Sequence, residues 1–222
     1  MRRCLLFLML SALGAAFSMR AGTVTISASG TGANASDSGG DFGQLGSYFA
    51  GLTTIGAGDI QWRDHFDFAI PLLNAPLLGA TFALDQPGSG FSPADGTDTT
   101  HTFSVLGLGA DHSFTAIGAG TLYASVTLNA ATDGTTVYIQ LSGAALADIL
   151  LAQGGVFHLG GVDSGESASA SGHWIGDWLG TGGGSGQSQL LLDIAPEPAS
   201  WLMMLGALVG LAAPVRRRAR RR

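Results

Sequence analysis

The sequence predicts an all-β fold: an antiparallel β-sandwich of jelly-roll type with one short helix. Two observations indicate this. Apolar and polar residues alternate with a period of two over many short stretches, and 35 glycines among 222 residues allow frequent turns between them. Only 12% of the residues are charged and 46% are hydrophobic, which is not the composition of a disordered chain. Many short strands with glycine turns favour a sandwich.

The clearest predicted strand covers residues 59–70, DIQWRDHFDFAI. Large apolar side chains occupy even-numbered positions and polar ones the odd-numbered positions, so the two sets face opposite sides of a strand. Asp64 interrupts the apolar side. Further strands are predicted at residues 23–28, 77–85, 101–107, 112–118, 155–161 and 188–194.

Residues 120–143 predict a β-hairpin, because two alternating arms flank Asp133-Gly134, a favoured turn dipeptide. Residues 144–153 predict the helix, since alanine and leucine dominate them and two glycines follow. The glycine-rich residues 29–43 and 181–189 predict loops.

Charge divides the chain into a body and two basic ends. There is no lysine, and nine of the ten arginines lie within 22 residues of an end. Between Gly22 and Ala195, Arg63 is the only basic residue against fifteen acidic ones, which gives this part a net charge of −14. Such a body repels nucleic-acid phosphates, so we exclude DNA and RNA as partners.

Residues 1–21 have the layout of a secretory signal peptide. Two arginines precede an apolar stretch that begins at Cys4 and is followed by small residues, and cleavage fits after Ala16 or after Ala21. The apolar stretch is short for a membrane-spanning helix. Because Cys4 is the only cysteine, the exported chain would contain neither a disulfide nor a thiol nucleophile. The alternative is a buried N-terminal helix.

The C-terminal segment begins with Pro196-Glu197-Pro198, a stiff extended spacer, because each proline fixes its own φ and restrains the preceding residue. Residues 199–215 carry no formal charge and would span about 25 Å as a helix, which suits a slightly thinned bilayer. By the positive-inside rule, the arginines that follow keep this end in the cytoplasm, so we predict a transmembrane helix. These are Arg216, Arg217, Arg218, Arg220, Arg221 and Arg222.

Residues 195–222 resemble a PEP-CTERM sorting signal, which combines the Pro-Glu-Pro motif, an apolar helix and an arginine cluster. Ala195 stands where the family often has valine. The resemblance implies that an exosortase, a membrane-embedded cysteine-peptidase-like enzyme, recognises Pro196, Glu197 and Pro198 and removes the tail. The membrane would then be a partner only before processing. The alternatives are a permanent anchor and a basic tail that binds nucleic acid or anionic lipid.

The body, residues 22–194, resembles a domain often found in PEP-CTERM proteins. This resemblance implies a sandwich related in style to carbohydrate-binding modules, and it identifies no enzyme. The stretches that carry it are residues 63–71, 77–84, 92–105 and 146–161.

No catalytic motif of the H-E-x-x-H or G-x-S-x-G type occurs. We interpret His65, His101 and His112 as solvent-facing residues on or beside strands, rather than as zinc ligands or catalytic groups. Asp95 and Asp98 lie in an oxygen-rich glycine loop that could bind Ca²⁺, although its spacing is not that of an EF-hand. No cofactor is predicted, with calcium as the alternative.

These observations predict a non-enzymatic protein that is exported across the inner membrane, transiently anchored there, and then located at the cell surface or outside the cell. Its predicted role is structural or adhesive within exopolysaccharide or biofilm. A carbohydrate-binding module is the alternative, with Trp174 or Trp178 stacking on a sugar unless these rings fill the core. A secreted hydrolase is a third, but the sequence does not select its catalytic carboxylates.

Overall fold

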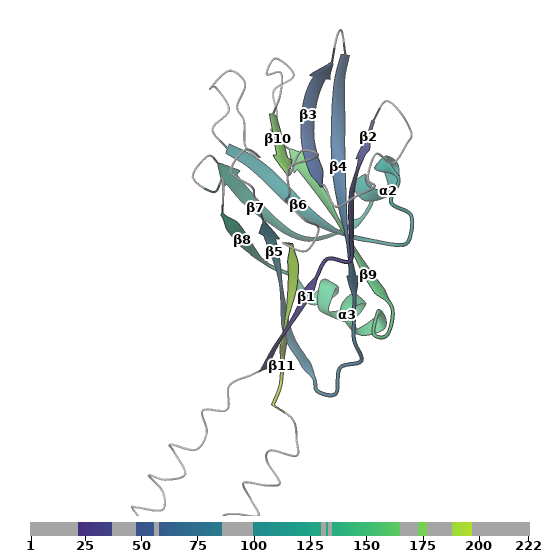
Figure 1. Ribbon diagram of the computed structural model, residues 1–222, viewed down its shortest axis with the longest axis vertical. Coiled ribbons are helices and arrows are strands. Elements are labelled where there is room, and N and C mark those ends of the chain that lie inside the picture. The colour runs from purple at the N-terminus through teal and green to yellow at the C-terminus, as the bar shows by residue number, and fades with distance from the viewer. Residues whose placement is uncertain are drawn as a thin grey trace, which may run out of the picture.

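The computed structural model describes residues 22–36, 48–55, 58–85, 100–129, 132, 135–164, 173–176 and 188–196. They form two antiparallel sheets packed in a sandwich-like arrangement, which confirms the all-β prediction (Figure 1). The predicted signal peptide and the predicted transmembrane helix lie outside the described residues. Within the part that the structure describes, no helix has the length and apolar character needed to cross a membrane.

The smaller sheet has four strands, and it confirms the strands predicted at residues 23–28, 77–85 and 188–194. Its first strand, β1, pairs along its whole length with the last, β11, so that Gly22 lies opposite Ile194. The two ends of the body are therefore neighbours. The strand order is β1 (Gly22–Ser27), β11 (Gln189–Ile194), β5 (Leu77–Asp85) and β8 (Thr136–Gln140).

The larger sheet has seven strands and is organised around β4 (Gly58–Ala69). One edge of β4 pairs with β2 (Gly30–Ala35), and the other pairs with β3 (Phe49–Ile55) and then with β9 (Val156–Ser164). The remaining strands are β10 (His173–Gly176), next to β3, and β6 (Thr100–Leu108) and β7 (Thr121–Asn129), beyond β9.

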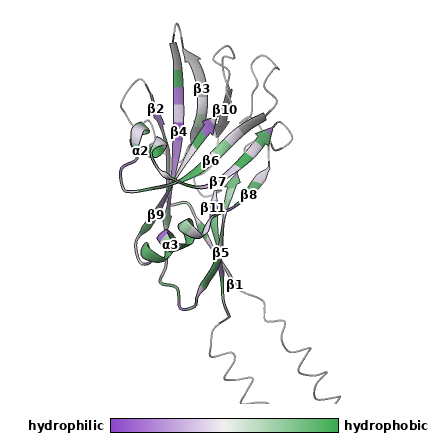
Figure 2. Ribbon diagram, turned by 180° about the vertical axis from the view of Figure 1, so that it is seen from behind, coloured by the Kyte–Doolittle hydropathy of each residue, from purple (hydrophilic) through white to green (hydrophobic). Residues whose placement is uncertain are grey.

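The core lies between the two sheets, as the period-two pattern of β4 predicts. Phe66 and Phe68 of β4 are fully buried, and their rings lie 4.9 and 6.1 Å from the ring of Phe82 on β5. Burial of side chains of this size contributes about 1.5–3 kcal/mol each. The odd-numbered residues of β4 lie on its opposite side, and Figure 2 shows hydrophilic as well as hydrophobic residues along this strand.

Two helices are described, rather than the single one predicted. α3 (Gly143–Leu151) confirms the predicted helix and buries Ala145 and Ile149. α2 (Phe114–Gly118) replaces the strand predicted at residues 112–118. Ser113 caps its first turn by accepting a hydrogen bond from the amide of Ala116, and Ile117 is fully buried. A local cap therefore overrides a short alternating pattern.

The predicted hairpin at residues 120–143 is wrong. β7 pairs with β6 in the larger sheet, whereas β8 pairs with β5 in the smaller one. Each arm still directs apolar side chains into the shared core. The alternating pattern therefore predicted both strands correctly, although it did not identify the strands with which they pair. A register shift in β7 lies opposite Val105 and Leu106, and beside it Tyr123 is buried whereas Leu122 is 57% exposed.

The loop predicted at residues 29–43 contains a strand, because Gly30–Ala35 forms β2. The small side chains of this strand give no alternating signal, yet most of them are buried beside β4. The short strands β3 and β10 were likewise not predicted. In all three cases pairing with a neighbouring strand, rather than local sequence, defines the element.

Candidate functional site

Three histidines and one aspartate gather on the outer face of the larger sheet; we call them the histidine cluster: His65, Asp67, His112 and His158. His65 and Asp67 lie two residues apart on β4, so both face away from the Phe66 and Phe68 core. His158 is the register partner of Asp67 on β9. His112 is supplied by the segment between β6 and α2.

The polar atoms of this cluster lie close together. His158 Nδ1 is 2.7 Å from Asp67 Oδ1 and 3.1 Å from His112 Nε2, and the third separation, from His112 Nε2 to Asp67 Oδ1, is 3.5 Å. The His65 ring stacks on the His112 ring, with centroids 4.2 Å apart. One ligand atom each from His65, Asp67 and His112 lie within 4.8 Å of one another. The cluster thus brings imidazole nitrogens and a carboxylate together.

The segment that carries His112 is held at His112 itself and at Phe114. Asn34 Nδ2 on β2 donates to the His112 carbonyl oxygen at 2.5 Å. Arg63, the only basic residue of the body, donates from Nη1 to the carbonyl oxygen of Phe114 at 2.6 Å and lies 3.8 Å above the Phe114 ring. These contacts within the protein hold His112 against the sheet without a bound ligand.

Glycines beside β4 leave room for the cluster. A Cβ at Gly30, the register partner of Asp67 on β2, would lie 2.9 Å from Asp67 Oδ2. A Cβ at Gly160, the partner of His65 on β9, would lie 2.8 Å from the Ile117 side chain of α2. Both separations are shorter than the contacts that a real Cβ makes with neighbouring atoms. The glycines therefore let the carboxylate and α2 approach the sheet.

The interpretation of His65 and His112 as solvent-facing strand residues is wrong. His65 is 5% exposed, and His112 lies on a segment outside the strands, with its side chain 19% exposed. Burial comes from α2 and the preceding segment, which cover this part of the outer face. His101 lies near the start of β6, away from the histidine cluster. His158 was not singled out from the sequence. Only the shared face of His65 and Asp67 was readable from spacing.

A buried pair of carboxyl groups, Asp64 and Asp163, lies on the inner side of the larger sheet. They are 0% and 1% exposed. A Cβ at Gly161, which pairs with Asp64, would lie 1.9 Å from Asp64 Oδ1, so the glycine makes space for this carboxyl. Burial first, and then the charge of Asp163, raise the pKa of Asp64 well above its ordinary range, whereas backbone amides oppose this rise. The neutral acid is therefore favoured.

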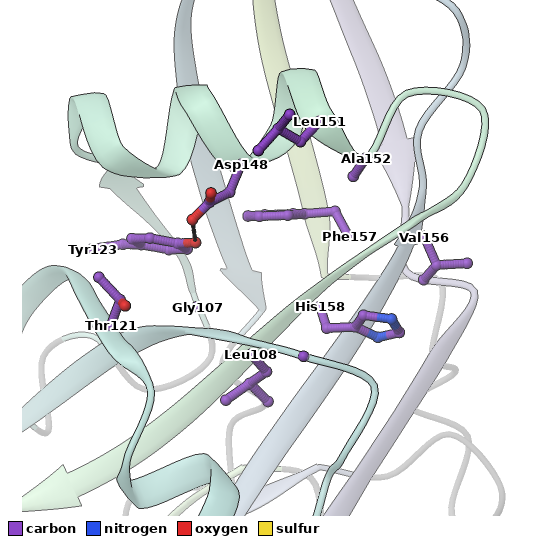
Figure 3. Close-up of a pocket in the computed structure, with 11 residues that line it drawn as sticks. Gly107, Leu108, Thr121, Tyr123, Asp148, Leu151, Ala152, Val156, Phe157 and His158 are labelled. Carbon is purple, nitrogen blue, oxygen red and sulfur yellow. Dashed lines mark hydrogen bonds between the residues drawn. The ribbon is translucent and has the colours of Figure 1, made fainter.

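A pocket of about 500 Å³ opens between α3 and strands β6, β7 and β9 (Figure 3). Tyr123 donates its hydroxyl hydrogen to Asp148 Oδ2 in this pocket, and His158 lies on its wall. Burial, followed by the hydrogen bond to Asp148 and its charge, raises the pKa of Tyr123 above its ordinary value. Through His158, the pocket borders the histidine cluster.

The residues singled out in the sequence have separate locations. Trp174 lies on the edge strand β10, opposite Gly51 of β3. Pro196 follows β11. The other predicted site residues lie outside the described ranges; they are Glu197, Pro198, the six C-terminal arginines, Trp178, Asp95 and Asp98.

A comparison with protein-family models finds none that matches the chain, and a comparison with curated proteins finds no match. Function is therefore inferred from the sequence patterns and from the geometry of the described residues.

Proposed function

We propose that this chain is an exported, non-enzymatic surface protein of the PEP-CTERM type with a structural or adhesive role in extracellular polysaccharide. An exosortase would recognise Pro196, Glu197 and Pro198 and remove the C-terminal tail. The three-part pattern of residues 195–222, together with the signal-peptide layout of residues 1–21, supports this proposal.

The structural observation that carries the proposal is the pairing of Gly22 with Ile194. The signal peptide precedes Gly22 and the sorting signal follows Ile194, so both would leave the body at adjacent positions of one sheet. A body whose two ends lie side by side presents the segments that precede and follow it at one place on its surface, which is compatible with attachment to a single membrane.

The boundary of the body also fits this proposal. The amide of Ala195 donates to the carbonyl oxygen of Pro76 at 2.9 Å. The next residue, Pro196, has no amide hydrogen to donate. Backbone pairing to the sandwich thus reaches Ala195, directly before the motif that a peptidase would have to grip as an extended strand.

We further propose that the sandwich has jelly-roll connectivity. Strands that are distant in the sequence are neighbours in both sheets, as β4 and β9 are in the larger sheet and β5 and β11 in the smaller one. The apolar core supplies stability that a chain without body cysteines cannot obtain from disulfides.

A carbohydrate-binding module is the second candidate, and the position of Trp174 on the edge strand β10 favours it. Its test is sedimentation of the protein with a panel of insoluble polysaccharides. Retention that is lost in Trp174→Ala would support this candidate, whereas absence of retention on every polysaccharide would count against it.

The main proposal is tested by the mass of the mature protein from the native host and from the same host lacking its exosortase. We expect loss of the residues that follow the motif in the native host and their retention in the deletion strain. The Pro196→Ala/Pro198→Ala variant should also retain the tail, whereas Pro214→Ala, outside the motif, should be processed. A native-host protein that keeps its residues beyond Pro198 would contradict the sorting claim.

A further inference from the structure

We propose that Asp67, His112 and His158 form a binding site for a divalent transition metal of the zinc class, with His65 or a solvent molecule at the fourth position. The inference goes beyond the proposed surface role and does not depend on it. Three observations carry it: the separations of the ligand atoms, the shortage of protons to satisfy them, and the access and charge around the cluster.

Two of the three separations, 3.1 and 3.5 Å, are close to those between the ligand atoms of a tetrahedral metal site, whereas the third, 2.7 Å, is shorter. The three atoms Asp67 Oδ1, His112 Nε2 and His158 Nδ1 form a triangle with sides of 2.7, 3.1 and 3.5 Å. Zinc bonds to nitrogen and oxygen of about 2.0–2.1 Å place tetrahedral ligand atoms roughly 3.3–3.4 Å apart. The observed triangle has a circumradius of about 1.8 Å, so a point at zinc-bond distance from all three atoms lies about 1 Å outside their plane.

Hydrogen bonds alone do not satisfy the three contacts as well as a bound cation would. His158 Nδ1 faces Asp67 Oδ1 and His112 Nε2 at the same time. A ring nitrogen carries at most one hydrogen, which weakens both contacts if it is divided between two acceptors. If His112 donates to His158 instead, His158 Nδ1 is the acceptor and carries no hydrogen, so it cannot donate to Asp67. A cation about 1 Å outside the plane of the three atoms would accept a lone pair from each of them.

The donor set indicates the class of metal, and its surroundings allow a cation to reach it. Imidazole nitrogens with one carboxylate suit Zn²⁺ and its neighbours in the transition series, whereas Ca²⁺ prefers a shell of oxygens. The side chains of Asp67, His112 and His158 are 23%, 19% and 19% exposed, so an ion can enter from solvent. The net charge of −14 in the body also attracts cations.

The fourth position falls to His65 or to a solvent molecule. His65 is buried beneath His112, and its ring is tilted by 28° from the His112 ring in the stack. Two stacked rings do not direct their nitrogens at one point, so ligation by His65 requires a rotation of its side chain. The Asn34 contact to the His112 carbonyl oxygen anchors the loop and does not involve the His65 side chain.

The test uses the full-length chain, purified in a mild detergent and stripped with a chelator, with Zn²⁺ as the titrant in calorimetry. We expect one Zn²⁺ per chain, and affinity at least about tenfold lower in His112→Gln and in His158→Gln. His101→Gln is the matched control. It lies on β6 seven positions from Leu108, the register partner of His158, which places it about 23 Å away along the strand.

Two further measurements keep the proposal testable if a variant folds poorly. In the unmodified chain, Zn²⁺ should raise the melting temperature, and bound Co²⁺ should show the visible bands of a four- or five-coordinate nitrogen and oxygen site. Absence of stoichiometric Zn²⁺ binding overturns the proposal. So does Zn²⁺ binding that survives unchanged in His112→Gln and His158→Gln, or that is lost equally in His101→Gln.

Discussion

His158 Nδ1 lies 2.7 Å from Asp67 Oδ1, although the two residues are 91 positions apart in the chain. They meet because Asp67 on β4 and His158 on β9 are register partners and both face the outer side of the larger sheet. A slip of one residue in this pairing would turn one of the two side chains to the opposite face. The pairing of two strands thus builds the centre of the histidine cluster.

Replacement of Asp67 by asparagine should destabilise the metal-free protein. The Asp67 carboxylate accepts a hydrogen bond from His158 Nδ1 in a partly buried setting. A charge-assisted hydrogen bond of this kind contributes about 1.5–3 kcal/mol to the free energy of unfolding. Because an amide keeps part of the contact, we expect Asp67→Asn to lower the free energy of unfolding by about 1–2 kcal/mol in urea denaturation. Asp193→Asn, at an exposed contact with Thr23, should change it by less than about 0.5 kcal/mol. Equal losses in the two variants would contradict this assignment.

A methyl group at Gly30 should displace the Asp67 carboxylate, because a Cβ there would lie 2.9 Å from Oδ2. We expect Gly30→Ala to weaken Zn²⁺ binding severalfold and to lower the free energy of unfolding by about 1 kcal/mol, measured by calorimetry and urea denaturation. Gly109→Ala is the control, since a Cβ at Gly109 meets nothing within 4 Å. Unchanged zinc affinity in Gly30→Ala would show that Asp67 does not need this space.

The raised pKa of Asp64 should make the protein less stable as the pH rises. The folded state holds a proton that the unfolded state releases, so stability is present below the ordinary aspartate pKa of about 3.9 and is lost as the pH rises towards the raised folded value. Above that pH window, each unit by which the pKa of Asp64 is raised lowers the free energy of unfolding by about 1.4 kcal/mol. Asp64→Asn should remove this slope and stabilise the protein at neutral pH, as measured by urea denaturation across the acid range.

Asp111 provides a control of opposite sign for Asp64. Hydrogen bonds from Ser113 lower the pKa of Asp111, so its contribution to stability is present above the ordinary aspartate pKa and is lost as the pH falls. Asp111→Asn should therefore leave the loss of stability that Asp64 causes at neutral pH unchanged. An Asp64→Asn variant with the same pH slope as the unmodified chain would refute the assignment to Asp64.

Loss of the Tyr123 hydroxyl should leave the Asp148 carboxylate without this donor inside the pocket. We expect Tyr123→Phe to lower the free energy of unfolding by about 1–2 kcal/mol at neutral pH. Tyr138→Phe, at a ring that is 67% exposed, should have almost no effect. Thermal melting of both variants checks this, and matching melting temperatures would contradict a stabilising role for the Tyr123 contact.

The same tyrosine should make stability fall at alkaline pH. Its folded pKa is raised, so the unfolded chain ionises first and stability is lost as the pH rises above the ordinary tyrosine pKa of about 10. Tyr123→Phe should reduce this alkaline loss.

Period-two alternation predicted much of the sandwich because strands such as β4, β5 and β11 bury one face in a common core. It failed for β2, whose glycines and alanines carry no alternation, and for α2, where Ser113 caps a helix within a strand-like pattern. The Asp133-Gly134 turn dipeptide suggested the wrong partner for β7, since partner choice depends on the whole sandwich rather than on a local turn.

The candidate site was only partly predictable. The shared face of His65 and Asp67 follows from their spacing on one strand. The contribution of His158 depends on the pairing of β9 with β4, and that of His112 depends on a segment held by Asn34 and Arg63. None of these contacts has a signal in the local sequence.

X-ray absorption at the zinc edge of the Zn²⁺-loaded, full-length chain tests the metal site most directly. We predict nitrogen and oxygen ligands at about 2.0–2.1 Å, with the outer-shell scattering of at least two imidazole rings. That imidazole scattering should decrease in His112→Gln and stay unchanged in His101→Gln. A zinc environment of oxygen ligands without imidazole, or one identical in both variants, would contradict the assignment of the metal site to the histidine cluster.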